Sequence, residues 1–379
     1  MLRTNDYSSK ATNRMKKNVA ILSAGLGNVS RGFETSASLW YQALAREKEL
    51  AVELFAGGPQ PQATRIWNLP RNGKVARLLR SLRLIQDGCR LEQLSFGLGL
   101  LPYLFRGKLD VVWLQEATLA SLMLRFKKMF HFRYRIMFCD GAPVGHAFAQ
   151  QFDYLIFLHA YALQAALADG IAARRCAVIP HVADVTVYPT SKADARAHFG
   201  LASDRFVIIC VAAWNKHHKR IDYLLQEVAQ LQRPEITLLL CGQPEQETQE
   251  LQAMAQDLGL DVQWHTLTRQ DLSLAYSAAD VFVLPSLHEG LAAVLLEAAA
   301  HQLPVLSHMH EGGKYVFGEA YEGLADFSQR GVLADRLKAW QAAADLSPIG
   351  AYTYRCVSER FNATTLTHTL VNFINRATL

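Results

Sequence analysis

Two carboxylates stand eight positions apart in the stretch Ala279–His308. Glu289 lies in a polar turn, and Glu297 lies among alanines and leucines. If the residues between them are helical, the two lie about 12 Å apart along the axis. Each carboxylate has two acceptor oxygens and therefore suits a diol. The N–H groups of Leu291 and Ala292, at the expected helix start, suit a diphosphate because the helix dipole favours negative charge there. The alternative is that Glu289 only caps the helix and Glu297 makes one polar contact.

The elements that must position these carboxylates form a compact unit. Asp280–Leu284 is a short apolar run that predicts a buried strand, and Leu303–Leu306 predicts the next strand. Between them, Leu291–His301 is apolar on all sides and predicts a buried helix. Strand, helix and strand over so short a stretch indicate a βαβ unit and hence a parallel sheet.

The same stretch resembles the donor-binding motif of glycosyltransferase family 4, whose members are retaining enzymes of GT-B fold. The matching residues are Pro285, Ser286, Glu289, Gly290 and Glu297. The resemblance implies an α/β protein with two Rossmann-like, parallel-sheet domains that face a central cleft. It also implies that Glu289 positions a sugar and that Glu297 holds a ribose. The chain departs from the family pattern after Gly290, where the usual Phe-Gly is replaced by leucine and alanine.

A second candidate phosphate site follows the predicted strand Phe206–Ala212. Lys216 and Lys219 lie in the turn after this strand and can reach a diphosphate. Lys219 matches a family lysine, and Gly242 matches a family glycine near the nucleotide base. The family arginine falls on Ala213 or Trp214, neither of which is basic, so Lys216 or Arg220 is the candidate to replace it. The alternative is a solvated basic turn.

The chain begins with another strand and glycine-rich turn. Asn18–Ser23 predicts a strand, and the turn after it contains Gly25 and Gly27. Such a turn lets the backbone approach a phosphate. The third glycine of the dinucleotide fingerprint is replaced by Ser30, and the acidic ribose ligand after the second strand is missing, which argues against a nicotinamide dehydrogenase. In the resembling family this is a flexible loop beside donor and acceptor, which makes Gly27 a candidate donor contact; the alternative is a tight turn only.

Polar residues also follow the strand predicted at Tyr134–Cys139. Asp140 comes directly after it, and His146 is the histidine nearest to the position at which the family often has one. Ligands bind at the carboxyl ends of parallel strands. Asp140 and His146 are therefore candidates for the acceptor side, although Asp140 can equally cap the turn.

The chain is long enough for two domains. We expect a polar tail at residues 1–17, an acceptor-side domain at 18–183 and a donor domain at 184–359. The segment Ile179–Asp184 resembles the family hinge, and a final helix at 360–379 is expected to pack back on the first domain. The six cysteines form no Cys-x-x-Cys pair and indicate reduced core residues of a cytoplasmic protein.

Charge is distributed unevenly between the two halves. Residues 1–180 carry 24 Lys and Arg against 12 Asp and Glu, a net +12, whereas residues 181–379 carry a net −7. This asymmetry indicates an anionic partner for the first half, or two oppositely charged domains that attract each other. Basic residues among leucines point to peripheral contact with the inner face of an anionic membrane, or to a solvated helix face. They are Lys74, Arg77, Arg80, Arg83 and Arg90.

Taken with the resemblance, these features predict a hexosyl-type glycosyltransferase. It would move a sugar from a nucleotide-diphosphate donor to a hydroxyl of a glycan or lipid-linked acceptor, with retention of anomeric configuration. We expect Glu289 and Lys219 to be catalytic, with no cofactor and no nucleic-acid partner. Metal-independence is expected because the chain has no Asp-x-Asp pair. The alternatives are a non-catalytic sugar-nucleotide-binding protein, or another GT-B enzyme such as a sugar-nucleotide epimerase.

Overall fold

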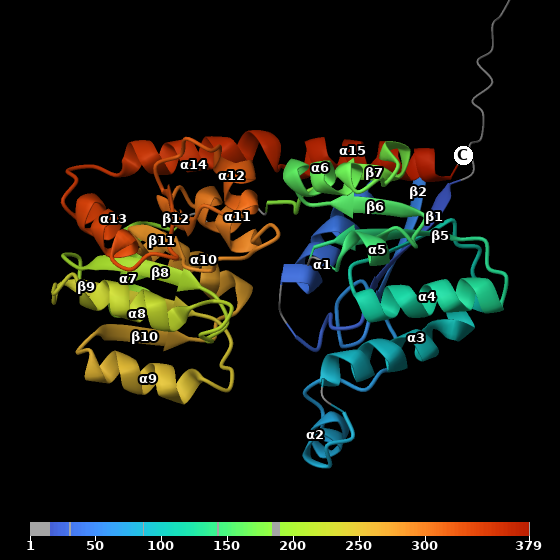
Figure 1. Ribbon diagram of the computed structural model, residues 1–379, viewed down its shortest axis with the longest axis horizontal. Helices are drawn as coiled ribbons and strands as arrows, with labels where there is room; N and C mark the ends of the chain where they lie inside the picture. The colour runs from blue at the N-terminus through green and yellow to red at the C-terminus, as the bar shows by residue number, and fades with distance from the viewer. Residues whose placement is uncertain (1–15, 30–31, 86, 142–143, 184–189, 379) are drawn as a thin grey trace, which may run out of the picture. The chain divides into compact units, whose positions relative to one another are not determined.

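The computed structural model describes residues 16–29, 32–85, 87–141, 144–183 and 190–378 (Figure 1). Most of the predicted tail at residues 1–17 lies outside these ranges, as do Ser30 of the glycine-rich turn and Asp184 at the end of the predicted hinge. The chain divides into two compact units. One holds the described residues up to Phe138 and those from Val371 onward, and the other holds Cys139–Leu370.

The first sheet has seven strands in the order β3-β2-β1-β4-β5-β6-β7, and the pairings described along it are parallel. Strand order reverses at β1, which pairs with β2 on one side and with β4 on the other. The strands are β1 (Lys17–Ser23), β2 (Leu50–Ala56), β3 (Thr64–Arg65), β4 (Val111–Leu114), β5 (Arg135–Asp140), β6 (Tyr154–Phe157) and β7 (Cys176–Val178).

The helices between these strands have ends that their sequences explain. Asp87 caps α3 by accepting a hydrogen bond from the N–H of Cys89, and His159 caps α6 in the same way. The helices are α1 (Gly32–Leu44), α2 (Lys74–Ser81), α3 (Gly88–Arg106), α4 (Ala117–Met129), α5 (His146–Ala149), α6 (Ala160–Ala168) and the 3₁₀ turn η1 (Ala173–Arg175). The basic segment from Lys74 to Arg90 is therefore not one helix, because Arg83 has a positive φ of 55° and follows the end of α2.

The second sheet has six parallel strands in the order β10-β9-β8-β11-β12-β13. Its strands are nearly continuous apolar runs, as expected for a sheet that is covered on both faces. They are β8 (Phe206–Val211), β9 (Ile236–Cys241), β10 (Asp261–His265), β11 (Val281–Leu284), β12 (Val305–His308) and β13 (Leu324–Ala325). Here the order reverses between β8 and β11.

The helices of the second half alternate with these strands. They are α7 (Lys192–His198), α8 (Ile221–Ala229), α9 (Thr248–Asp257), α10 (Arg269–Ala278), α11 (Ala293–Ala300), α12 (Glu311–Phe317), α13 (Val332–Gln341), α14 (Ser347–Arg360) and α15 (Ala363–Ala377). A buried apolar cluster joins β8, β9 and β11 to α8 and α13. Near the end of the chain, Asn375 donates a hydrogen bond to Glu49 over 3.2 Å.

The predicted strands are confirmed to within a residue or two at their ends. The helix predicted from Leu291 begins instead at Ala293, because Ala292 has an extended backbone with φ −68° and ψ 111°. The six cysteines are free thiols, and four of them lie in the core as predicted, whereas Cys89 and Cys356 are only half-buried. Among the described residues, no helix combines the length and the apolar character that crossing a membrane requires.

Candidate functional site

The centre of the candidate site is an ion pair between Lys219 and Glu289. Lys219 Nζ lies 2.5 Å from Glu289 Oε1, and the two side chains are 19% and 10% exposed. Lys219 comes from the turn after β8 and Glu289 from the turn after β11, which are neighbouring strands. The pair therefore lies at the carboxyl edge of the second sheet, at the point where strand order reverses. In open α/β sheets this is where ligands bind.

Asn215 holds the turn that carries Lys219. Its Oδ1 accepts hydrogen bonds from the backbone N–H of Lys219 at 2.7 Å and from that of His218 at 3.1 Å. Its Nδ2 donates to Glu245, 3.0 Å away. The side chain of a buried asparagine thus fixes the backbone from which the lysine extends.

The pair controls the charge state of Glu289. Burial by itself would raise the pKa of this carboxyl, but the nearby Lys219 ammonium reverses the shift and lowers the pKa below its ordinary value. Glu289 is therefore an ionised carboxylate at neutral pH. In that state it accepts hydrogen bonds and donates none.

Arg220, one of the two candidates to replace the family arginine, supports the turn. Its Nη1 donates to the carbonyl oxygens of Pro285 and Phe327, and its guanidinium lies 4.1 Å from the centre of the Tyr223 ring. The side chain is thus tied to the backbone at the end of β11. Arg220 therefore braces the segment that leads to Glu289.

Glu297 lies on α11 and accepts a hydrogen bond from the Tyr276 hydroxyl over 2.9 Å. Tyr276 is almost completely buried, and burial, followed by the Glu297 charge, raises its pKa, so its hydroxyl stays a proton donor. The side chain of Ala292, the N-cap residue of α11, accepts no hydrogen bond from the first N–H groups of the helix. These groups, together with the backbone of Leu291 and Ala292 just before the helix, remain suited to an anion.

The turn before α11 packs against the start of α12. A Cβ on Gly312 would lie 2.2 Å from the carbonyl oxygen of Gly290, so no larger residue fits at position 312. His310 caps α12 through Nδ1, which accepts from the N–H of Gly313 at 3.0 Å. Burial lowers the pKa of His310 to about 4, so the ring is neutral at physiological pH and acts as a cap.

Two further predicted donor residues lie beside the same sheet edge. Lys216 Nζ is 2.6 Å from Glu250 of α9, and the Lys216 backbone N–H donates to Glu247. Gly242 closes the end of β9, where its N–H donates to the carbonyl of His265 over 2.9 Å. The charge of the Lys216 ammonium is thus compensated by Glu250, a partner that the sequence pattern did not indicate.

Asp140 and His146, predicted for the acceptor side, and Gly27, predicted as a donor contact, lie at or after the carboxyl ends of strands of the first sheet. Asp140 ends β5, and burial raises its pKa to about 6 against the opposing effect of His146. His146 Nδ1 lies 2.5 Å from Asp169 Oδ2. Gly27, in the turn after β1, has φ +81°. Within the ranges that the structure describes, no group of three or more His, Cys, Asp or Glu side chains is arranged to hold a metal ion.

Sequence comparison concerns the segment that carries the Lys219–Glu289 pair. Residues 191–345 match the family model described as "Glycosyl transferases group 1". A curated relative is D-inositol 3-phosphate glycosyltransferase of Mycobacteroides abscessus, which is 35% identical over 132 residues. The alignment covers 33% of this chain and spans only 29% of that relative.

Comparison of structures covers nearly the whole chain. The sucrose-phosphate synthase of Thermosynechococcus elongatus has a TM-score of 0.76 at 18% identity, over 95% of this chain and 99% of that one. Anabaena HepE in complex with UDP-glucose has a TM-score of 0.74 at 17% identity, over 94% and 99%. The fold is therefore that of two Rossmann-like, parallel-sheet domains of GT-B type. In sequence, the similarity to group 1 glycosyltransferases is found at residues 191–345, whereas the likeness in fold extends over nearly the whole chain.

Three side chains of the site were missed by reasoning from sequence. Asn215 stands in a turn, where asparagine is common, and only its contacts distinguish it. Tyr276 lies 21 residues before Glu297, so no local spacing relates the two. His310 stands two residues before the glycine pair Gly312–Gly313, and this pair is the sequence feature that could have pointed to it.

Proposed function

We propose that the protein transfers a sugar from a nucleoside diphosphate sugar to an acceptor hydroxyl with retention of anomeric configuration. The bond between the anomeric carbon and the phosphate oxygen breaks, and a bond from the same carbon to the acceptor oxygen forms on the same face. The acceptor proton passes to the leaving phosphate. No side-chain base is then required.

The observation that carries this proposal is the Lys219–Glu289 pair at the reversal point of the second sheet. Glu289 is an ionised acceptor suited to sugar hydroxyls, and Lys219 is a cation beside it that suits a diphosphate. Charge that develops on the leaving group is stabilised most by donors that are already in position. Asn215 and Arg220 supply that preorganisation by fixing the two turns.

The remaining donor contacts follow from the same edge of the sheet. Glu297, oriented by Tyr276, would accept hydrogen bonds from ribose hydroxyls, and Gly242 would lie near the base. The backbone at Gly290, Leu291 and Ala292 would bind phosphate oxygens. Lys216 would bind the diphosphate only after its ion pair with Glu250 breaks. The complex of Anabaena HepE with UDP-glucose favours a uridine nucleotide as the first donor to test.

On the acceptor side we propose Asp140 and His146, and Gly27 remains a proposed donor contact in a turn that lies beside both substrates. Because the pKa of Asp140 is about 6, this carboxyl is mostly ionised at neutral pH and can accept a hydrogen bond from a hydroxyl. We further propose that transfer needs no divalent metal. Lys219 and the N–H groups at the start of α11 supply positive charge to the diphosphate.

We further propose that the acceptor is lipid-linked and carried by a membrane. Helix α2 buries only Ala76, whereas Leu78 and Leu84 in and after it are 58% and 67% exposed, with Arg77 and Arg83 beside them. In Figure 1, α2 lies at the tip of the first unit, beyond α3. Exposed leucines among arginines are typical of segments that lie on an anionic bilayer. Anionic lipid headgroups are the matching partner for a half-chain of net charge +12.

The test is a transfer assay with a panel of nucleoside diphosphate sugars, with and without glycan and lipid-linked acceptors. We expect nucleotide release that depends on acceptor, a product with the donor's anomeric configuration by NMR, and undiminished rates in chelator. Donor binding without turnover would support the non-catalytic alternative. Conversion of the donor sugar without acceptor would support an epimerase. A rate lost in chelator and restored by magnesium or manganese would contradict metal-independence.

A further inference from the structure

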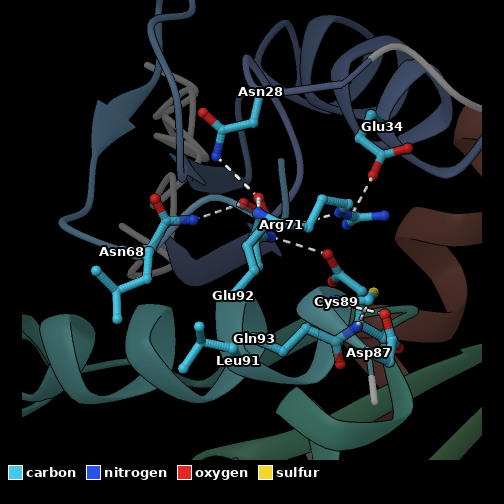
Figure 2. A network of polar contacts seen from close by, with 12 residues as sticks. Asn28, Glu34, Asn68, Arg71, Asp87, Cys89, Leu91, Glu92 and Gln93 are labelled. Carbon is cyan, nitrogen blue, oxygen red and sulfur yellow. Dashed lines mark hydrogen bonds and ion pairs between the residues drawn. The ribbon is translucent and has the colours of Figure 1, made fainter. Parts of the chain in front are cut away.

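A buried ion-pair network lies at the glycine-rich turn of the first unit (Figure 2), whereas the Lys219–Glu289 pair belongs to the other unit. The guanidinium of Arg71 lies between two carboxylates. Its Nε is 2.6 Å from Glu92 Oε2 on α3, and its Nη2 is 3.6 Å from Glu34 Oε1 on α1. All three residues are more than nine-tenths buried.

This network holds the turn that follows β1. Asn28 donates a side-chain hydrogen bond to Glu92 Oε1 over 3.1 Å. A Cβ on Gly25 would lie 2.2 Å from Glu34 Oε1 and 2.7 Å from Arg71 Nη2, so the ion pair rests directly on the backbone of the turn. Glycine at position 25 is therefore a requirement of the network.

Both peptide groups of Ala24 are anchored as well. Its N–H donates to Glu116 Oε1 at 2.8 Å, and its carbonyl accepts from Asn68 Nδ2 at 3.0 Å. Glu116 lies two residues past the end of β4, so its bond to Ala24 joins the carboxyl ends of β1 and β4. These are the strands between which the order of the first sheet reverses. The anchored turn therefore lies at the position where a parallel sheet binds its ligand.

The charges make Arg71 the centre of this arrangement. Burial, followed by the charge of Glu34, raises the pKa of Glu116 to about 8, so Glu116 is largely neutral at pH 7. Arg71 is then the cation that compensates Glu34 and Glu92. A lysine can keep the charge but not the fork of donors that reaches both carboxylates and supports two sides of the turn.

We propose that Arg71 is a positioning residue, which holds the turn Ala24–Val29 in the conformation that binds the acceptor at the edge of the first sheet. This inference rests on the proposed transfer reaction. Arg71 touches neither reacting atom and acts through Glu34, Glu92 and Asn28. Arg71 therefore acts apart from the Lys219–Glu289 pair, which belongs to the other unit.

The test uses Arg71→Lys in the full-length protein, with Arg46→Met as the control, because Arg46 is an exposed residue of the same unit. We expect Arg71→Lys to raise the KM for acceptor by about tenfold while changing kcat much less. The dissociation constant for UDP, measured calorimetrically, should stay within about twofold of wild type. The control should match wild type in all three quantities. An unchanged KM for acceptor, or an equal loss of UDP affinity, would overturn the proposal.

Hydrogen exchange separates this proposal from the transfer reaction itself. Amides of residues 24–29 should exchange at least about tenfold faster in Arg71→Lys than in wild type, while those of β1 and α4 stay protected. Glu92→Gln, which retains an acceptor for Asn28, serves as the second variant if Arg71→Lys folds poorly. Faster exchange in Arg71→Lys would show that Arg71 anchors the turn in the wild-type protein. If neither wild type nor any variant then showed measurable transfer, the anchoring role would stand and the proposed reaction would be refuted. Unchanged exchange at residues 24–29 in both variants would refute the role of Arg71, whatever the activity.

Discussion

Replacing Lys219 with methionine tests the ion pair at the centre of the candidate donor site. The substitution leaves Glu289, which is only 10% exposed, without its cation. Removing one partner of a buried pair costs about 3–5 kcal/mol. Because the lysine is itself partly exposed, we expect a loss of unfolding free energy at the lower end, about 3 kcal/mol.

The effect on catalysis should be separable from the effect on stability. Loss of one donor to developing charge lowers a rate by about 10²–10³-fold, so kcat of Lys219→Met should fall by that factor. In the double variant Lys219→Met/Glu289→Gln, the unpaired buried charge is gone. Most of the lost unfolding free energy should therefore return, while transfer stays low because neither the cation nor the carboxylate is present.

The assay combines urea unfolding with initial rates at saturating donor. Lys192→Met is the matched control, because Lys192 also lies 2.5 Å from a carboxylate, Asp280, but is 49% exposed. It should change the unfolding free energy by less than about 1 kcal/mol and leave transfer at the wild-type rate. A kcat for Lys219→Met within about threefold of wild type would refute the assigned role, as would recovery of the rate in the double variant.

Three further predictions concern protonation, donor affinity and membranes. The pKa of Glu116 is raised from 4.5 to about 8, so between these values the folded state holds a proton that the unfolded state has lost, and unfolding free energy falls as pH rises. Glu116→Gln should remove that slope. In urea unfolding from about pH 5 to pH 8, the unfolding free energy of the variant relative to that of wild type should therefore rise with pH, by at most about 1.4 kcal/mol per pH unit. Tyr276→Phe should weaken UDP binding by about fivefold, the loss of about 1 kcal/mol for one hydrogen bond, with kcat retained; an unchanged calorimetric affinity would argue against Glu297 as a ribose ligand. The protein should sediment with anionic vesicles at low salt and less at about 0.5 M salt, and Arg77→Glu/Arg83→Glu should weaken this binding where Arg233→Glu does not; absence of sedimentation at low salt would point to an acceptor in solution.

Much of the local structure could be predicted because it depends on neighbours in sequence. Apolar runs predicted strands in both sheets, among them β1, β5, β8, β11 and β12, and the βαβ pattern around Glu289 predicted the parallel arrangement of β11 and β12. The start of α11 was less predictable. Alanine and leucine, which occupy positions 291–293, both favour helix, so nothing local indicates that Ala292 stays extended.

The sequence by itself determined which chemical groups stand at the ends of the strands, since strand periodicity and turn residues act over a few positions. The tertiary structure alone decided which of those groups meet. Lys219 and Glu289 are 70 residues apart, and they form a pair because β8 and β11 are neighbours in the sheet. Arg71 and Glu92 belong to separate segments of the first unit, and their contact depends on how α3 packs. Long-range pairing depends on burial and on the order of the strands, which no local pattern contains.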